Sequence, residues 1–315
     1  MNIIDNDGTE AAFPLAAGRP EEEKKMDHRK CEALLMSLEQ GSMTAAAKTL
    51  GYTQSGITRM IASLEDEVGF PLLLRAKKGV ALTRNGELLL PALRDLCNAH
   101  RQADELAADI RGVVTGTLSI GSYYRIAANL LPAILRDFGE RYPGITVRLE
   151  EGGNREMARW LTEHSVDLCF CAEPNKDVEC DWLPLFEDEM VAWLPQDHPL
   201  ANAKGFPVSR FETEPFIITA PNNDTELDRL LAEEKLKPDI RFSTRNGFTT
   251  RSMVAAGLGI SFNQRLISRS WNDSVVEIPL DPPHTLTLGL AAPDLKEVSP
   301  AGKRFIEFAR AAIAG

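Results

Sequence analysis

The chain has 315 residues, enough for about two domains and a substantial core. Its 43% hydrophobic and 26% charged residues are typical of a globular protein, and it has no apolar run of about 18 residues, which excludes a membrane-spanning segment by pattern. The net charge of −11 alone opposes nucleic-acid binding, but residues 26–85 hold eight basic and six acidic residues and have a positive balance.

Residues 1–25 carry six acidic residues and show neither a helical nor a strand period. We predict a disordered tail here, and we find no signal-peptide pattern. An odd number of cysteines argues against a disulfide framework and favours a reducing cytoplasm. Cys169 and Cys171, with Cys180 nearby, could form a redox or metal-binding trio. We favour the alternative, in which Cys169 and Cys171 lie on one face of a buried strand.

Three short helices are predicted next, over residues 27–40, 43–50 and 54–68. Ser42 and Thr53 are good N-caps, and a glycine ends the first and third helices. A small hairpin with a basic tip follows around residues 77–79. In the third helix, Ile57, Ile61 and Leu64 share one face, whereas the opposite face is small, polar and basic.

The second and third helices form a helix-turn-helix pattern that suits the major groove of DNA. Gln54 can pair with adenine and Arg59 with guanine. A plain three-helix domain remains the alternative on pattern alone. The candidate DNA-binding residues are Ser42, Thr53, Gln54, Ser55, Thr58 and Arg59, with Arg75, Lys77 and Lys78 of the hairpin near the phosphate backbone or minor groove.

A long helix is predicted over residues 84–111, with Thr83 as its cap. Apolar residues recur along it at coiled-coil spacing, and we favour pairing with another chain over packing on its own domain. This heptad stripe consists of Leu89, Leu96, Ala103 and Ile110, together with Ala92, Ala99 and Leu106.

Strands alternate with helices from residue 117 onward, which predicts parallel sheets covered by helices. The expected strands are 117–121, 145–150, 166–171, 190–194, 216–219, 239–243 and one entered from 257–262. The expected helices are 126–142, 156–163, 225–234, 249–256 and 299–312.

Residues 28–88 resemble the DNA-binding domain of the LysR-type transcriptional regulators. The matching segments run from Gly41 to Ala47 and from Thr53 to Ile61, followed by Leu73-Leu74-Arg75 and Leu82-Thr83-Arg84. Gly56 departs from the family, which often has proline there. The remainder is similar to the family's effector domain, most clearly at Val254-Ala255-Ala256-Gly257-Leu258-Gly259-Ile260.

The resemblance implies a fold class of α plus α/β. After the disordered tail (1–25), it predicts a winged helix-turn-helix domain (26–85), a linker helix for dimerisation (86–112) and an effector domain (113–315). The effector domain would have two α/β subdomains, like type 2 periplasmic binding proteins, with an effector between them.

Ligands of open α/β sheets bind beyond the carboxyl ends of the strands, and Ser122 and Asn154 match effector-contacting positions of the family. Tyr123 either stacks on an aromatic effector or packs in the hinge, and Arg125 either adds positive charge or merely meets solvent. The candidate effector-binding residues are Ser122, Tyr123, Asn154, Thr219, Thr249 and Asn263.

Enzyme motifs for phosphate cradles, metalloproteases and nucleophile elbows do not occur, so no catalytic residue, metal site or cofactor is expected. The expected partners are promoter DNA, a small-molecule effector, further copies of the chain as a dimer or tetramer, and RNA polymerase, with no membrane. The alternatives are a solute-binding or catalytic α/β module, and a winged-helix regulator whose α/β part senses nothing.

Overall fold

The computed structural model describes residues 26–76, 79–221, 225–269, 271 and 274–314. The disordered tail predicted for residues 1–25, and the hairpin residues Lys77 and Lys78, lie outside the described residues. The chain divides into two compact units between Ala81 and Leu82.

The first unit contains three helices and the start of a short hairpin. They are α1 (His28–Glu39), α2 (Met43–Leu50), α3 (Gln54–Val68), β1 (Leu73–Ala76) and β2 (Gly79–Leu82), which reaches the second unit. The predicted caps are confirmed, because Ser42 and Thr53 each accept a backbone N–H of the helix that follows. Leu34, Ile57 and Leu64 are fully buried among the helices.

The second unit begins with the long helix α4 (Arg84–Ile110), which Thr83 caps as predicted. Most of the heptad stripe is exposed in the single chain: the exposed fractions are 36% for Leu96, 53% for Leu106 and 80% for Ile110. Leu90, Leu93 and Ala108 on other faces of α4 are buried. The chain itself therefore leaves the stripe largely uncovered.

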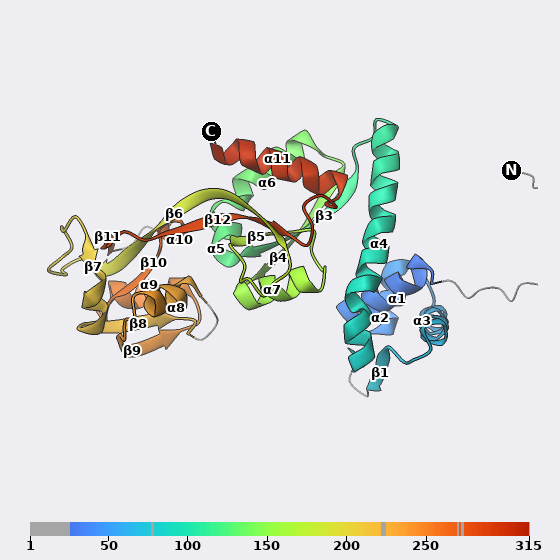
Figure 1. Cartoon of the computed structure of the whole chain (residues 1–315), viewed down its shortest axis with the longest axis horizontal. Helices are drawn as coiled ribbons and strands as arrows, with labels where there is room; N and C mark the ends of the chain where they lie inside the picture. The colour runs from blue at the N-terminus through green and yellow to red at the C-terminus, as the bar shows by residue number, and fades with distance from the viewer. Residues whose placement is uncertain (1–25, 77–78, 222–224, 270, 272–273, 315) are drawn as a thin grey trace, which may run out of the picture. The chain divides into compact units, whose positions relative to one another are not determined.

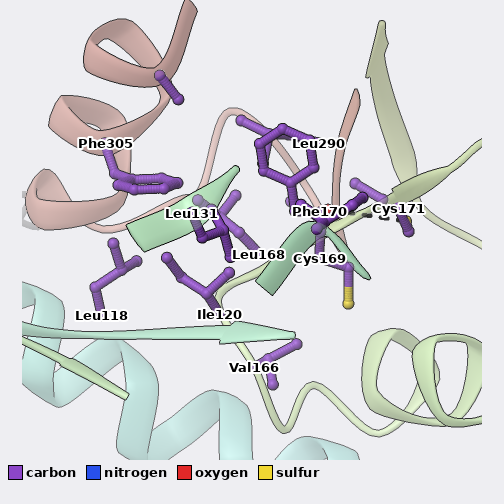
Figure 2. Close-up of a cluster of buried hydrophobic side chains, with 14 of the residues drawn as sticks. Leu118, Ile120, Leu131, Val166, Leu168, Cys169, Phe170, Cys171, Leu290 and Phe305 are labelled. Atoms are coloured by element: carbon purple, nitrogen blue, oxygen red, sulfur yellow. Dashed lines mark hydrogen bonds between the residues drawn. The ribbon is translucent and has the colours of Figure 1, made fainter. Parts of the chain in front are cut away.

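The first subdomain of the effector domain is built on three parallel strands, in the order β4-β3-β5, with β12 antiparallel to β5. Helix α11 packs against α6 (Figure 1). Figure 2 shows its core, where Phe305 of α11 meets side chains of the sheet. The elements are β3 (Gly116–Tyr123), α5 (Tyr124–Asn129), α6 (Leu131–Arg141), β4 (Ile145–Gly152), α7 (Asn154–Thr162), β5 (Leu168–Ala172), β12 (Thr285–Ala292) and α11 (Pro300–Ala314).

The second subdomain has its own core, in which the rings of Phe206, Phe211, Phe216 and Phe262 pack in tilted and edge-to-face pairs with centroid distances of 4.8–5.8 Å. Its elements are β7 (Phe206–Pro207), η1 (Val208–Glu212), β8 (Pro215–Thr219), α8 (Glu226–Glu233), β9 (Asp239–Thr244), α9 (Gly247–Ala255), β10 (Ser261–Gln264), α10 (Arg265–Ser268) and β11 (Val275–Asp281).

One strand belongs to both subdomains. Strand β6 (Asp181–Pro195) pairs with β12 along its first part and with β10 and β11 along its last part (Figure 1). All three pairings are antiparallel. The predicted parallel pairing holds for β3 with β4 and β5 and for β8 with β9, but not for β6, so the large sheet is mixed. The helix expected over residues 126–142 is also two helices, because α5 ends at Asn129 and α6 begins at Leu131 with Pro132 in its first turn.

Candidate DNA-binding surface and effector cleft

The start of α3 presents a polar face to solvent. Gln54, Ser55 and Arg59 are exposed, whereas Ile57 and Ile61 on the other face are buried. Within the described part of the chain, no hydrogen bond or ion pair engages the Arg59 guanidinium, so its donors are available to another molecule. A helix with this division between faces can dock in a major groove.

The predicted DNA-contacting hydroxyl groups of Ser42, Thr53 and Thr58 make hydrogen bonds within the domain. Thr53 Oγ1 accepts the N–H of Gly56 at 3.1 Å, and Thr58 Oγ1 donates to the carbonyl of Gln54 at 2.9 Å. The half-buried Ser42 Oγ accepts the N–H of Ala45 at 3.4 Å. These three residues therefore fix the helix starts and the local geometry, whatever further contacts they make.

The wing is anchored to α3 through a side chain that the sequence reading did not single out. Glu65 Oε1 accepts the backbone N–H groups of Leu72 and Leu73 at 2.7 and 3.0 Å. Arg75 lies in β1, directly after this anchor. Glu65 therefore fixes the position of the start of β1, and so of the β1–β2 hairpin (the wing), relative to α3.

In the effector domain, predicted residues meet at the carboxyl end of β3. Ser122 is fully buried and donates to the carbonyl of Tyr123 at 3.3 Å. The Tyr123 hydroxyl donates to Asn154 Oδ1 at the start of α7. Tyr123 is only 6% exposed and belongs to the core, so packing occupies most of its ring. Burial, and then the nearby Glu226 carboxylate, raise the pKa of Tyr123 well above its ordinary value.

The other predicted effector residues come from the second subdomain. Thr219 Oγ1 lies 2.6 Å from Thr250 Oγ1 and is buried. Thr249 is exposed, and its N–H donates to Asn246 Oδ1 at the start of α9. Asn263, fully buried at the end of β10, accepts from Arg125 at 3.2 Å. Asn263 is thus joined to α5 of the first subdomain, whereas the two threonines are not.

Three residues of the cleft were missed by sequence reasoning. Gln264 Oε1 accepts from Arg125 Nη1 at 2.6 Å, Glu226 Oε2 lies 3.7 Å from the same nitrogen, and Arg229 Nη1 donates to the carbonyl of Glu173. The Asn263–Gln264 pair after an apolar strand was the available signal. Glu226 gave none, because an acid in the first turn of a helix is usually explained by capping.

A cavity of about 250 Å³ lies beside Tyr123 and Asn154. The other predicted effector residues do not line it: Ser122, Thr219, Thr249 and Asn263. Tyr123, Asn154, Met157, Cys171 and Val178 of the first subdomain line it, together with Arg229 of α8. It is therefore placed beyond the carboxyl ends of β3 and β5, where open α/β sheets bind ligands.

The cysteine trio does not form a reactive site. Cys169 and Cys171 are buried in β5, and burial raises the pKa of both thiols far above the ordinary value (Figure 2). Over the residues that are described, no group of His, Cys, Asp and Glu side chains has the arrangement of a metal site.

Residues 28–87 match the family profile described as "Bacterial regulatory helix-turn-helix protein, lysR family", and residues 111–314 match "LysR substrate binding domain". The chain belongs to the LysR family. A LysR-family relative, the uncharacterized HTH-type transcriptional regulator YvbU of Bacillus subtilis (strain 168), is 28% identical over 275 residues, which cover 86% of this chain and 94% of YvbU.

Two solved structures share the fold of this LysR-family chain. A single-residue variant of full-length OxyR from Pseudomonas aeruginosa has a TM-score of 0.77 at 20% identity, with 92% of this chain and 95% of OxyR covered. Full-length CbnR in complex with its target DNA has a TM-score of 0.60 at 20% identity, with 91% and 100% covered. The predicted fold class, a winged helix-turn-helix followed by a two-subdomain effector domain, is confirmed.

Membership of the LysR family makes this chain a DNA-binding transcriptional regulator controlled by an effector, and not an enzyme. Among the helices described, none has the length and apolar character needed to cross a membrane.

Proposed function

We propose that this regulator acts in the cytoplasm and reads its operator with Gln54, Ser55 and Arg59 of α3. The observation that carries the proposal is the exposed Arg59 guanidinium, which the described residues leave without a partner on the polar face of the helix. Arginine and glutamine recognise guanine and adenine through paired hydrogen bonds in the major groove. The proposed further base or phosphate contacts are Ser42, Thr53, Thr58, Arg75, Lys77 and Lys78.

The operator is bound by a dimer in this proposal, and the heptad stripe of α4 joins its two copies. The exposure of Leu106 and Ile110 supports it, since such a stripe is normally covered by a second helix. Two dimers assemble into a tetramer, and the bound complex contacts RNA polymerase. Each recognition helix then faces one half of a palindromic site.

The effector binds between the two subdomains, with Ser122, Tyr123 and Asn154 on one side and Thr219, Thr249 and Asn263 on the other. The cavity beyond the strand ends, which Tyr123 and Asn154 line, supports the first-subdomain side of this placement. An effector that binds one arrangement of the subunits more tightly shifts the population toward it and changes how the DNA is bent.

Footprinting of the DNA upstream of the gene tests the proposal. The wild-type protein should protect a palindromic site, and the triple variant with alanine at Gln54, Ser55 and Arg59 should protect none. Circular dichroism and thermal unfolding would show that the variant is folded. Protection by the folded triple variant, equal to that of the wild type, would refute base reading by α3.

A further inference from the structure

Four polar side chains from three elements meet between the two subdomains. Arg125 extends from α5, Glu226 from the first turn of α8, and Asn263 and Gln264 from the end of β10. Arg125 Nη1 donates to Gln264 Oε1 at 2.6 Å and to Asn263 Oδ1 at 3.2 Å, and lies 3.7 Å from Glu226 Oε2. We call these four residues the cleft cluster.

Three atoms of the cleft cluster have unmet hydrogen-bonding capacity. Glu226 Oε1, Asn263 Nδ2 and Gln264 Nε2 are buried and find no hydrogen-bond partner among the described residues. The exposed fractions of these residues are 6%, 0% and 2%. Buried polar groups in folded proteins are nearly always paired, so these three atoms indicate a partner molecule.

The two amide groups are oriented by their other contacts. Asn263 Oδ1 accepts both from Arg125 and from the N–H of Gln264 at 3.1 Å, which directs the amino group away from Arg125. Gln264 likewise turns its oxygen to Arg125. The cluster therefore offers two N–H₂ donors and one carboxylate oxygen acceptor to a ligand.

The charge of the cluster limits which ligand suits it. Arg125 and Glu226 bring one positive and one negative charge to a site with little access to water. A pure anion would lie beside the buried Glu226 carboxylate, and a pure cation beside the half-buried Arg125 guanidinium, so each would leave one charge uncompensated. A ligand that carries both a positive and a negative charge keeps the net charge of the site at zero.

We propose that the effector is a small zwitterion of the amino-acid class, whose carboxylate binds Arg125, Asn263 and Gln264 and whose ammonium group binds Glu226. The proposal rests on the effector-binding role assigned to the cleft above. Every unpartnered atom of the cluster then gains a partner: the amide N–H₂ groups donate to the carboxylate, and Glu226 Oε1 accepts from the ammonium group.

The neighbouring cavity has room for the rest of the molecule. Arg229, one turn after Glu226 on α8, lines the cavity of about 250 Å³. Tyr123 and Cys171, at the carboxyl ends of β3 and β5, line the same cavity. Met157, Ala158 and Val178 suit an apolar side chain on the effector.

Isothermal titration calorimetry on the full-length protein tests the ligand class. The panel consists of the twenty protein amino acids, ornithine, β-alanine and γ-aminobutyrate, together with the matched acid lacking the amino group and the matched amine lacking the carboxylate. We expect an amino acid to bind, and both of its matched analogues to bind at least about tenfold more weakly. This comparison uses the wild-type protein and does not depend on any variant folding.

Glu226→Gln and Arg125→Gln should each weaken binding of that amino acid at least about tenfold, since each removes one charge of the pair. In Glu226→Gln the loss for the matched acid should be smaller, because the acid has no ammonium group. Glu140→Gln and Arg148→Gln, which lose the same charges at positions outside the cluster, are the controls and should bind like the wild type.

Two results would overturn the zwitterion: no amino acid of the panel binds, or the matched acid binds as tightly as the amino acid. If the matched acid binds and changes the operator footprint, the effector function of the cleft stands and only its proposed ligand class fails. If the wild-type protein protects no operator, with or without these ligands, the proposed function itself fails.

Discussion

Arg101 of α4 and Asp167, the residue directly before β5, form an ion pair, with 2.5 Å between Nη2 and Oδ1. Arg101 Nη1 also donates to the carbonyl of Thr117 at 2.7 Å and to Glu105, and Asp167 Oδ2 accepts the N–H of Ser119. Burial alone would lower the pKa of Arg101, but the carboxylates of Asp167 and Glu105 raise it, so the guanidinium stays charged. The long helix is thus joined to β3 and β5 by one connected polar network.

Replacing Arg101 with alanine should lower the free energy of unfolding by about 3–5 kcal/mol, because the carboxylates of Asp167 and Glu105 stay buried without their cation. Urea unfolding followed by circular dichroism measures this. Arg136→Ala removes an arginine whose ion pair with Asp137 is exposed and should leave the unfolding midpoint unchanged. Equal midpoints for the wild type and Arg101→Ala would show that the network does not stabilise the fold.

We expect the stability of the fold to depend on pH through Asp188 of β6. Burial raises its pKa above the ordinary 3.8, although it accepts the N–H of Leu266. The folded state therefore binds this proton more tightly than the unfolded state, and stability falls as the pH rises from 3.8 through the folded pKa. In Asp188→Asn this contribution is absent, so the stability of the variant relative to the wild type should increase with pH over that window. Urea titrations from about pH 4 to about pH 7 measure the difference, and parallel curves would contradict it.

The thiols predict a pattern of chemical labelling. Cys31, Cys169 and Cys171 are buried, so a maleimide cannot reach them and should not modify them in the folded protein at neutral pH. Mass spectrometry should find label only on Cys97 and Cys180, which are partly exposed. All five should react in guanidinium chloride. Rapid labelling of Cys169 in the folded protein would restore the redox interpretation of the trio.

Arg59→Ala should cost about 1–3 kcal/mol of specific binding and relax the preference at one base position. Gel-shift titrations on the operator and on its single-base variants measure both effects. Arg29→Ala is the control, because it removes the same charge from an exposed position of α1 in the same domain. A loss for Arg59→Ala that is equal on all DNA sequences would reassign Arg59 to a phosphate contact.

Leu106→Glu should convert the dimer to a monomer, because it places a charge in the exposed heptad stripe. Sedimentation velocity distinguishes the two states. Leu106→Met preserves the apolar volume and should remain dimeric. If Leu106→Glu sediments as a dimer, the copies associate through another surface.

Local signals predicted the helices of the first unit closely. Thr53 and Ser42 begin helices because their side chains accept backbone N–H groups a few residues later, and Gly51 and Gly69 end them in the left-handed conformation at φ 71° and 83°. Both effects depend on neighbours in sequence, so they can be read without the fold.

The antiparallel pairing of β12 with β6 could not be read in this way. Leu288 pairs with Phe186 across about a hundred residues, and nothing near either residue specifies that partner. The cleft cluster could not be predicted for the same reason. Glu226 is buried only because α8 folds against elements distant in sequence. The break between α5 and α6 at Leu130 is a different case. Pro132 is a local signal for it, but the apolar pattern over residues 126–142 favoured one continuous helix.

Strand β6 makes the two subdomains of the effector domain thermodynamically dependent on each other. Since its backbone pairs with β12 in one core and with β10 and β11 in the other, melting of either core removes partners from the remaining one. The domain should therefore melt in a single cooperative transition, and a fragment that carries one subdomain alone would present an unpaired edge prone to aggregation.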